Sequence, residues 1–370
     1  MKKALSILKW TGLSLLVFLI IALPIATLTN WWVRGFEPQA PVETENFVRP
    51  TEQPQPGASL KFMTYNIKFG GARINFFFDC YGDRVLMTEA EVRTNLEALA
   101  QKINKEDPDV LFLQEVDRGS DRVAGLDQLK ILAELTGYPY AVYASQWDVS
   151  WVPSNGIGKV NSGNAILSKY PLKRSLRYRL PLIGEQPFWK RFFYLRRNIL
   201  KSELLLPGDI SILLYNTHLS AYTSDGTRKQ QLEELYTLVI DAKENKQPVV
   251  FGGDLNTLPP GTKKFKDFDD SACEEEFVMD NYEQELNWLK PFYEEFSEVI
   301  PLNKYVQNES AYYSHTVRGD GFWNRRLDYL FSNGQWVPGS GQVQQEAAQG
   351  GVATMPLSDH APVVGRLRLR

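Results

Sequence analysis

Short strand-like runs of hydrophobic residues alternate with longer helix-like runs from about residue 60 to the end of the chain. Runs of four to eight β-branched and aromatic residues favour buried strands, whereas apolar positions repeating every three or four residues favour amphipathic helices. Thr88 and Glu91 form a capping box, which predicts the start of a helix that continues to about Lys105. The predicted strands are 61–69, 110–113, 140–144, 165–168, 199–206, 212–216, 249–251, 327–331 and 362–369, and the predicted helices are 88–105, 126–136 and 227–245.

Many of these predicted strands follow one another without a helix between them. A parallel βαβ ladder needs a crossover helix between neighbouring strands, so this order favours two packed sheets with helices on their outer faces. The sequence contains no internal repeat. It therefore predicts one α/β domain that extends over residues 60–370.

The first 34 residues are predicted to form a membrane-spanning anchor. Residues 13–28 are almost wholly apolar, lysines precede them, and tryptophans flank them on both sides. Extended to Trp10 and Trp32, the segment has roughly the 20 residues that a transmembrane helix needs, with aromatic rings at both interfaces. A cleaved secretory signal shares the basic start and the apolar middle, and it is the alternative. Both interpretations place the rest of the chain outside the cytoplasm, and the anchor contacts the membrane through residues 10–32.

Composition narrows the class of protein further. Residues 35–59 contain repeated prolines among polar residues, which predicts an extended linker. Over the whole chain 43% of residues are hydrophobic and 23% are charged, which is typical of a globular protein rather than a disordered chain. The formal net charge is −3, and an acidic body is a poor generic binder of polyanions. The two cysteines, Cys80 and Cys273, lie far apart in the sequence and in no metal-ligand spacing.

The segment 249–256, Val-Val-Phe-Gly-Gly-Asp-Leu-Asn, combines a buried strand with two candidate functional side chains. Its two glycines are expected to let the backbone turn and approach a ligand closely. Asp254 and Asn256 are two residues apart, so on an extended segment they point the same way. A carboxylate and an amide facing one spot suit a water molecule that must be oriented and deprotonated. A strand followed by an Asx turn is the alternative for these two residues alone.

Polar side chains also stand at the ends of several other apolar strands. Each of these side chains alone could be a turn residue or a hydrogen-bonded core group. So many polar residues at the ends of apolar strands are unlikely to arise by chance. Two of the three histidines belong to this set. Its members are Asn66, Glu115, Asn164, His218, Asp254, Asn256, Asp328, Asp359 and His360.

Metal-assisted hydrolysis of a phosphoester is the chemistry that this set favours. Carboxylate and amide oxygens without a cysteine cluster suit Mg²⁺ or Mn²⁺ rather than structural zinc. Glu115 would hold the ion, which polarises a non-bridging phosphate oxygen. Asp254 would accept the proton of the attacking water, and Asn256 would fix the position of that water.

Two histidines complete the predicted mechanism. His218 and His360 would donate hydrogen bonds to the phosphoryl oxygens as charge shifts during an in-line displacement. Asp328 would keep His360 oriented and favour its cationic form. Acyl transfer by a Ser/His/Asp triad is the weaker competitor, because the chain has no Gly-x-Ser-x-Gly elbow.

Seven short motifs contain these polar residues. They are Thr-Tyr-Asn-Ile at 64–67, Leu-Gln-Glu-Val-Asp at 113–117, Gly-Asn-Ala-Ile-Leu-Ser at 163–168, Asn-Thr-His-Leu at 216–219, Gly-Gly-Asp-Leu-Asn at 252–256, Leu-Asp-Tyr at 327–329 and Ser-Asp-His-Ala-Pro at 358–362. In this order they resemble the endonuclease/exonuclease/phosphatase superfamily. Its members include pancreatic-type deoxyribonucleases, abasic-site endonucleases, inositol-polyphosphate phosphatases and neutral sphingomyelinases.

The resemblance covers about residue 60 to the C-terminus and implies a four-layered α/β sandwich with its site where two sheets meet. Asn164 matches a motif position for which the resemblance gives no firm role. The implied roles are a metal site at Asn66, Glu115 and Asp359, a water-activating and phosphate-orienting pair at Asp254 and Asn256, a phosphate contact at His218, and an acid–histidine pair at Asp328 and His360.

Members of this superfamily act on different substrates, so the substrate has to be inferred from other features of the sequence. The leading hypothesis is a membrane-anchored, extracytoplasmic phosphodiesterase or phosphatase that acts on a lipid head group or another small phosphoester, with no obligate protein partner. Residues 169–201 are rich in Lys and Arg, with Glu185 as the single acid, and they include Trp189 and Phe193. Such a segment is typical of a loop that enters a lipid headgroup layer. A hairpin that packs these rings into the core is the alternative.

Two other functions remain open. The first is an extracytoplasmic nuclease, for which residues 169–201 would supply a local basic surface despite the acidic body. The second is a tethered binding module that has kept the fold without catalysis. All seven motifs keep the polar residues that the chemistry needs, which favours an enzyme.

Overall fold

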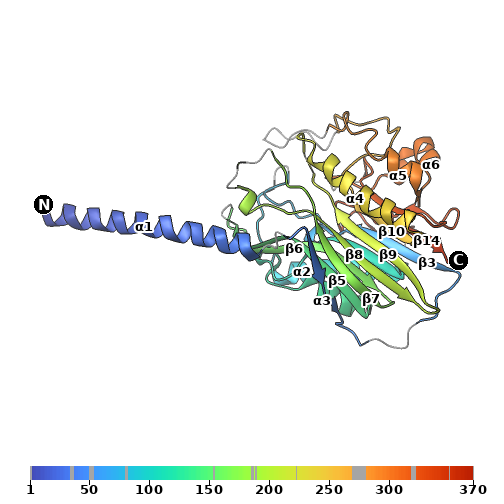
Figure 1. The fold of residues 1–370 in the computed structure, drawn as a ribbon, viewed down its shortest axis with the longest axis horizontal. Coiled ribbons are helices and arrows are strands. Elements are labelled where there is room, and N and C mark those ends of the chain that lie inside the picture. Colours follow the sequence, from blue (N-terminus) through green and yellow to red (C-terminus); the bar gives the residue numbers. More distant parts are fainter. Residues whose placement is uncertain are drawn as a thin grey trace.

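Two packed sheets with helices on their outer faces form the body of the protein, and a long N-terminal helix projects from it in the computed structural model (Figure 1). The structure describes residues 2–33, 37–49, 54–79, 82–152, 155–184, 187, 190–221, 223–268, 281–317, 322–349 and 351–369. Of residues 2–8, 26–33 and 192 it describes only the backbone. Cys80, Cys273 and Trp189, which entered the sequence interpretation, lie outside the described residues.

The first sheet has seven strands and supplies half of the site. In spatial order they are β1 (Gln39–Val42), β7 (Leu172–Arg179), β8 (Asn198–Leu206), β9 (Ile210–His218), β10 (Val249–Asp254), β12 (Asp328–Ser332) and β11 (Ser297–Glu298). Strands β9 and β10 are parallel, and the other neighbouring pairs are antiparallel.

The second sheet also has seven strands and supplies the other half. In spatial order they are β13 (Gln342–Val343), β14 (Val363–Arg368), β3 (Ser59–Asn66), β4 (Val110–Asp117), β6 (Gly158–Ser168), β5 (Tyr140–Val152) and β2 (Thr44–Glu45). Here β3 and β4 are parallel, and the remaining pairs are antiparallel. Each sheet therefore has a parallel pair near its centre.

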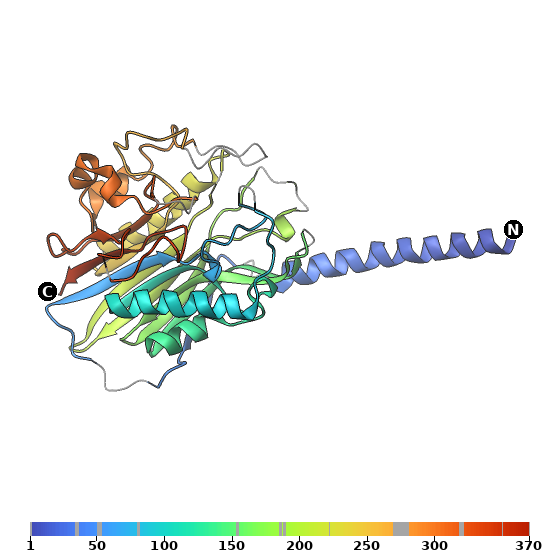
Figure 2. The same ribbon diagram turned by 180° about the vertical axis from the view of Figure 1, so that it is seen from behind.

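Helices cover the outer face of each sheet. α2 (Glu89–Glu106) and α3 (Gln128–Thr136) pack on the second sheet, as Figure 2 shows. α4 (Thr227–Glu244) and α5 (Lys290–Glu295) pack on the first sheet. The order helix, sheet, sheet, helix confirms the predicted α/β sandwich. The other helical segments are α1 (Lys2–Val33), α6 (Leu302–Gln307) and four short 3₁₀ turns, η1 (Lys68–Gly70), η2 (Asp121–Val123), η3 (Lys190–Phe192) and η4 (Glu309–Tyr312).

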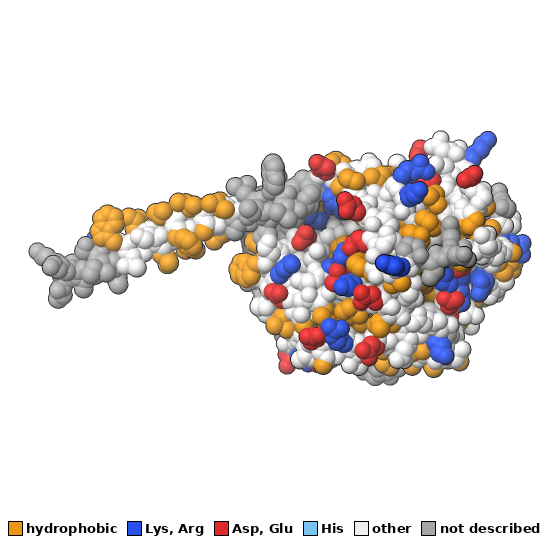
Figure 3. Space-filling model, turned by 90° about the horizontal axis from the view of Figure 1, so that it is seen from below, with side chains coloured by type: hydrophobic (Ala, Val, Ile, Leu, Met, Phe, Trp, Pro, Cys, Tyr) orange, Lys and Arg blue, Asp and Glu red, His pale blue; other side chains and the backbone are white. Residues whose placement is uncertain are grey.

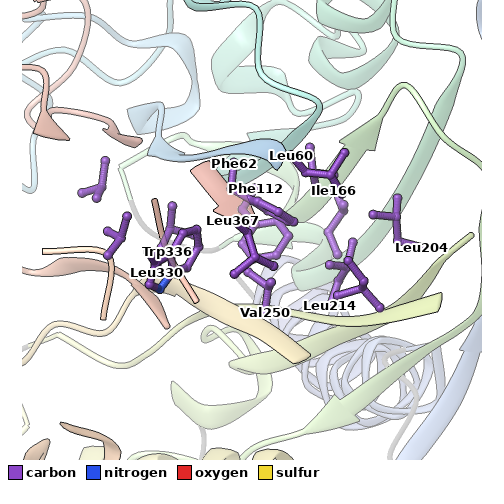
Figure 4. Close-up of a cluster of buried hydrophobic side chains, with 14 of the residues drawn as sticks. Leu60, Phe62, Phe112, Ile166, Leu204, Leu214, Val250, Leu330, Trp336 and Leu367 are labelled. Carbon is purple, nitrogen blue, oxygen red and sulfur yellow. The ribbon is translucent and has the colours of Figure 1, made fainter. Parts of the chain in front are cut away.

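A hydrophobic core fills the space between the inner faces of the two sheets. Phe62 and Phe112 from the second sheet belong to the same fully buried cluster as Val250 and Leu330 from the first (Figure 4). Trp336 packs edge-on against Phe62, with ring centroids 6.1 Å apart. Burial of apolar surface contributes roughly 25 cal/mol per Å², so this layer holds the sheets together and fixes where their ends meet.

Local sequence signals set the ends of the helices as predicted. The hydroxyl of Thr88 accepts a hydrogen bond from the backbone N–H of Glu91, and the Glu91 carboxylate accepts one from the backbone N–H of Thr88. This reciprocal pairing satisfies two N–H groups that the first turn of α2 leaves without partners. Gly137 ends α3 in the left-handed conformation, with φ of 75°. Both features confirm the sequence prediction.

Two segments, residues 39–45 and the aromatic-basic segment 169–201, differ from the leading sequence prediction because contacts between distant residues decide them. Residues 39–45 lie in the predicted linker but form the edge strands β1 and β2, where Pro41 pairs with Leu176. Proline is tolerated there because an edge strand does not need every N–H. Strand β7 lies inside the aromatic-basic segment, and Phe193 of that segment packs edge-on against Trp151. For Phe193 the packed hairpin is therefore the better description.

The N-terminal helix α1 carries an exposed apolar surface. The described side chains from Trp10 to Ile25 are mostly exposed, and apolar side chains line this helix in Figure 3. Trp10 and Phe18 are each about two-thirds exposed. A bilayer span needs about 20 consecutive, predominantly apolar residues. Among the residues whose placement is described, no helix has the length and apolarity to cross a membrane. The predicted transmembrane anchor is therefore not supported.

Candidate active site

Three predicted site residues lie side by side at one end of the first sheet. The register of β9 and β10 pairs His218 with Asp254. Strand β12 runs antiparallel along the other side of β10, and its first residue, Asp328, also pairs with Asp254. Because side chains of directly paired residues project from the same face of a sheet, the three groups converge.

The second sheet brings its polar strand end to the same place. Strand β3 ends at Asn66, which pairs with Gln114 of β4, and Glu115 follows immediately. His360 lies in the turn just before β14, the other neighbour of β3. The amide of Asn66 donates a hydrogen bond to Asp254 Oδ2 at 3.1 Å, which joins the two sheets across the site.

Glu115 reaches the site because its strand is irregular. The pairing of β4 with β6 changes register between Leu113 and Val116, and Glu115 has a positive φ of 58°. A bulge of this kind leaves one residue unpaired and redirects its side chain. The Glu115 carboxylate accepts a hydrogen bond from Asn66 Nδ2 at 3.3 Å and lies 3.8 Å from His218 Nδ1.

Asp254 is the centre of the arrangement and is buried. His218 Nε2 and His360 Nε2 lie 3.3 Å and 3.5 Å from its Oδ2, and the backbone N–H of Asn256 donates to its Oδ1 at 3.0 Å. Burial raises the pKa of Asp254 to about 7, with the charge of His360 opposing this shift and that of Asp328 adding to it. A carboxylate with a pKa near neutrality can both take up and release a proton at physiological pH.

His360 is held as a cation by the carboxylate behind it. Its Nδ1 lies 2.8 Å from Asp328 Oδ2, and the same oxygen accepts a hydrogen bond from the Ser314 hydroxyl at 2.7 Å. Burial alone would lower the pKa of His360, but the charges of Asp328 and Asp254 outweigh it and raise the pKa to about 10. The predicted acid–histidine pair is thus in contact, with Nε2 of the ring facing Asp254.

His218 differs in charge from His360. Burial, followed by the positive charges of Arg197 and His360, lowers the pKa of His218 well below its usual value. At neutral pH the ring is therefore uncharged, with one nitrogen as donor and the other as acceptor. Its Nδ1 makes no hydrogen bond within the described part of the chain. The two histidines thus offer the site one neutral and one cationic imidazole.

The two remaining asparagines of the predicted site are placed differently. Asn256 lies next to Asp254 with a positive φ of 49°, and its Nδ2 donates to the carbonyl of Leu219 at 3.0 Å. Its Oδ1 is therefore the side-chain atom that can meet a bound water. Asn164 instead donates to the Asn198 carbonyl at 3.3 Å and links β6 to β8. This contact gives Asn164 a structural connection beside the site.

The two glycines of β10 serve strand packing, which differs from the expected approach to a ligand. A Cβ atom at Gly252 would lie 1.9 Å from the Tyr329 carbonyl oxygen, and one at Gly253 would lie 2.0 Å from that of Thr217. Gly253 also has φ of 117°, which side chains other than hydrogen rarely allow. The glycines therefore let β9 and β12 close onto β10 and bring their polar ends to Asp254.

The donor set on the second sheet fits a hard divalent cation. Asp359 accepts from the Ser358 hydroxyl at 3.2 Å, and its other oxygen lies 4.0 Å from Lys68 Nζ. Burial, and next the negative charge of Asp359, raises the pKa of Glu115, so the two carboxylates repel each other. A divalent cation stabilises such an arrangement, and Mg²⁺ and Mn²⁺ prefer oxygen ligands. Asn66, Glu115 and Asp359 are the residues that could hold it.

Sequence reasoning missed three groups beside the site. Lys68 is buried, and its Nζ lies 2.9 Å from Asp79. Arg197 lies close enough to Glu115 that the two charges affect each other's pKa. The ring centroid of His315, the third histidine of the chain, lies 4.5 Å from that of His360. In the sequence, Lys68 and Arg197 are ordinary basic residues, and His315 is marked only as the third histidine of the chain.

Residues 63–360 match the Endonuclease/Exonuclease/phosphatase family. The chain belongs to this family, whose members hydrolyse phosphoesters. The match confirms the family resemblance drawn from the seven motifs.

The chain is also similar to individual proteins. It is 26% identical over 197 residues to an inositol phosphosphingolipids phospholipase C of Schizosaccharomyces pombe, a match that covers 49% of this chain and 40% of that relative. An endonuclease/exonuclease/phosphatase from Beutenbergia cavernae aligns with a TM-score of 0.57 and 23% identity over 85% of this chain and 72% of that one. The human Nocturnin catalytic domain, solved with a bound sulfate, aligns with a TM-score of 0.51 and 17% identity over 89% and 98% of the two chains. The two structures show a shared fold.

Proposed function

We propose that this protein is a divalent-metal-dependent phosphoester hydrolase that promotes in-line attack of water on phosphorus. One observation carries the proposal. Side-chain nitrogens of Asn66, His218 and His360 all lie within 3.5 Å of Asp254 Oδ2, where the two sheets meet. Three nitrogen groups around one buried carboxylate orient it as a base and surround the space next to it with hydrogen-bond donors.

Asp254 acts as the general base in this mechanism. Its pKa of about 7 makes the carboxylate a stronger base than an exposed aspartate, while leaving much of it deprotonated at neutral pH. The backbone N–H of Asn256 fixes one carboxylate oxygen, and the side-chain oxygen of Asn256 can position the water. The proton of the attacking water passes to Asp254.

The histidines stabilise the negative charge that develops on the phosphoryl oxygens. Cationic His360 donates from Nε2, because Asp328 occupies its Nδ1. Neutral His218 donates one further hydrogen bond. Donors that are already in place when charge develops lower the barrier without reorganisation. When bound by Asn66, Glu115 and Asp359, Mg²⁺ or Mn²⁺ would polarise a non-bridging phosphate oxygen.

A lipid head group is the substrate class that we favour. The yeast relative is named for cleavage of inositol phosphosphingolipids, which are phosphodiesters of a lipid and a head group. Because the match covers less than half of each chain, this specificity is a proposal for the present protein. A soluble phosphodiester would undergo the same chemistry in the same site.

Contact with a membrane surface and a location outside the cytoplasm belong to the same proposal. The exposed apolar side chains of α1 support contact with a membrane surface, and α1 contacts η3 in the aromatic-basic segment. Trp151, near the end of β5, is 58% exposed. Trp151→Ser is expected to lower turnover on anionic lipid vesicles while leaving turnover of a soluble phosphodiester unchanged. Equal losses on both substrates would argue against membrane contact through this surface.

A substrate panel with the full chain tests the function. The panel contains bis(4-nitrophenyl) phosphate, sphingomyelin vesicles, phosphoinositide vesicles and plasmid DNA, each with Mg²⁺, with Mn²⁺ and after metal removal with EDTA. We expect metal-dependent hydrolysis of the soluble diester and of one lipid. Cleavage of DNA without cleavage of either lipid would instead favour the nuclease alternative.

Asp254→Asn provides the decisive variant. The substitution preserves size but removes the base, so turnover should fall by about 10²- to 10⁴-fold. Asp209→Asn is the matched control, because Asp209 is an exposed carboxylate in the turn between β8 and β9, at the opposite end of the strand from His218. Unchanged hydrolysis by Asp254→Asn would refute the mechanism. Absence of any hydrolysis by the wild-type chain would favour a non-catalytic binding module.

A further inference from the structure

A second group of possible metal ligands lies next to the catalytic residues. One ring nitrogen of His315, one of His360 and one carboxylate oxygen of Asp359 lie within 4.8 Å of one another. The two imidazole rings are 4.5 Å apart and tilted by 45°. The group contains two nitrogens and one oxygen, whereas the site proposed for Mg²⁺ contains oxygen ligands. The two sets share only Asp359.

The fold fixes His315 in this position through its backbone. The N–H of His315 donates to the Arg325 carbonyl at 3.0 Å, and the N–H of the following Thr316 donates to the Asp359 carbonyl at 3.0 Å. A bridge also pairs His315 directly with His360. The segment that carries His315 is therefore tied to the segment that carries both other ligands.

The side chain of His315 has an unused polar atom. It is only 8% exposed, and its Nδ1 makes no hydrogen bond within the described part of the chain. Buried polar groups in folded proteins are nearly always hydrogen-bonded or bound to an ion, so an unpartnered ring nitrogen requires an explanation. A metal ion beside His360 and Asp359 supplies one.

We propose that His315, Asp359 and His360 form a zinc site whose occupation inhibits the hydrolase. Two imidazoles and one carboxylate are a common ligand set for protein-bound zinc, with a fourth position left for water. Mg²⁺ prefers six oxygen ligands in near-ideal octahedral geometry, so it does not compete effectively for two imidazoles. The site therefore discriminates between an activating ion and an inhibitory one.

The required rearrangement is small. Zinc binds imidazole nitrogen and carboxylate oxygen at about 2.0–2.2 Å, which places tetrahedral ligands about 3.4 Å apart. Ligand atoms that now lie within 4.8 Å of one another must therefore approach by about 1.4 Å at most. We expect rotations about the side-chain bonds of Asp359 and His315 to supply such a shift without movement of the paired backbone.

The surroundings of His360 support a metal at its Nε2. Asp328 holds Nδ1 at 2.8 Å and thereby fixes the ring, as carboxylates commonly do behind zinc-bound histidines. Zinc binding releases the Nε2 proton to solvent, and the negative charges of Asp328 and Asp254 that stabilise this proton also attract the cation. Because Nε2 is also the atom that faces Asp254 at 3.5 Å, bound zinc removes it from the reaction.

Zinc binding is measured directly, so that this part does not depend on the proposed function. Metal-free full-length protein is titrated with ZnCl₂ by calorimetry in the presence of excess MgCl₂, and the zinc-loaded protein is examined by X-ray absorption. We expect one tight site with two imidazole ligands. His315→Asn should weaken zinc binding on the order of 100-fold, since even residues behind a ligand contribute 10- to 100-fold.

A matched control separates loss of a ligand from local disturbance. Asn324→Ala alters the residue whose backbone N–H donates to the His315 carbonyl, but the Asn324 side chain makes no hydrogen bond within the described residues. This variant should bind zinc as the wild type does. Thermal melting without metal verifies that both variants are folded. Zinc affinity that His315→Asn leaves unchanged, or an absorption spectrum with oxygen ligands alone, would overturn the proposal.

The inhibitory effect rests on the proposed function and is tested separately. With bis(4-nitrophenyl) phosphate and Mg²⁺, zinc should inhibit the wild type and Asn324→Ala at the concentration that fills the site. His315→Asn should keep its basal turnover and require on the order of 100-fold more zinc. If zinc binds through His315 but does not slow hydrolysis, the inhibitory role is wrong while the metal site and the hydrolase both stand.

Discussion

Replacement of Asp328 by asparagine tests how the site holds His360 in its cationic form. Asp328 is fully buried and accepts hydrogen bonds from the Ser314 hydroxyl at 2.7 Å and from His360 Nδ1 at 2.8 Å. Asparagine has the same shape and can accept both bonds through its carbonyl oxygen. The substitution therefore removes one negative charge while leaving the packing in place.

The expected magnitude follows from the lost charge. A hydrogen bond to a charged group contributes about 1.5–3 kcal/mol, which corresponds to about one to two pKa units. The pKa of His360, about 10 in the wild type, should therefore fall to about 8–9 in Asp328→Asn. Because a ring with a pKa of about 8–9 is still protonated at pH 7, turnover should be lost mainly above about pH 8, where the imidazolium that stabilises the transition state deprotonates.

Titration of the histidine rings by nuclear magnetic resonance measures this pKa without relying on activity. The chain has three histidines, so single substitutions assign their signals. His218 and His315 should remain neutral at pH 7, because burial lowers the pKa of each well below its usual value. The alkaline limb of the pH profile of kcat/KM should move with the His360 signal. A His360 pKa that is the same in both proteins would refute this account of the acid–histidine pair.

Stability should show the same linkage with a defined sign. The folded-state pKa of His360 is raised from 6.5 to about 10, so protonation of this ring stabilises the folded protein fully below pH 6.5. That contribution is lost as pH rises from 6.5 through 10. Because the variant has a lower pKa of about 8–9, it loses its smaller contribution first, and the difference in Tm should persist to about pH 8 and shrink between about pH 8 and pH 10. A difference that is constant with pH would show that the charge of Asp328 does not act through His360.

Three further substitutions test how the fold supports the site. Gly253→Ala places a Cβ atom 2.0 Å from the Thr217 carbonyl oxygen, in a backbone with φ of 117°. We expect the free energy of unfolding in urea to fall by about 1–3 kcal/mol and turnover to decrease. An unchanged urea midpoint would contradict the packing role of this glycine. Arg326→Met leaves Glu298 buried without its partner at 2.7 Å and should cost about 3–5 kcal/mol, whereas the double change with Glu298→Met should recover much of it. Thr88→Ala removes the cap of α2 and should cost about 1 kcal/mol without altering kcat, and a larger loss would mean that the cap acts beyond this helix.

The order of the elements could be predicted from the sequence because each signal was local. Apolar runs bounded by polar residues located the central strands, and the capping box and Gly137 located helix ends. The predicted polar residues at strand ends include three that the structure pairs directly, His218, Asp254 and Asp328. A residue at the end of a buried strand can be identified in this way because burial leaves a clear hydrophobic pattern before it.

Other features could not be predicted because they depend on contacts between distant segments. The edge strands β1 and β2 exist only because β7 and β5 offer unpaired backbone groups to a proline-containing segment. The direction of Glu115 depends on a register shift between β4 and β6, which no local pattern records. The proximity of His315 to His360 arises from a bridge between segments 45 residues apart, and nothing in the composition of either segment indicates it.

The sequence by itself determined which residue types stand at the ends of buried strands, and through them the family and the class of chemistry. Only the tertiary structure decided which of those residues touch, which of the two histidines near Asp254 is charged, and which groups form a second cluster beside them. The physical reason is that hydrophobic patterning acts over a few neighbouring residues. Strand register, burial and the mutual effect of charges arise only when segments far apart in the chain pack against each other.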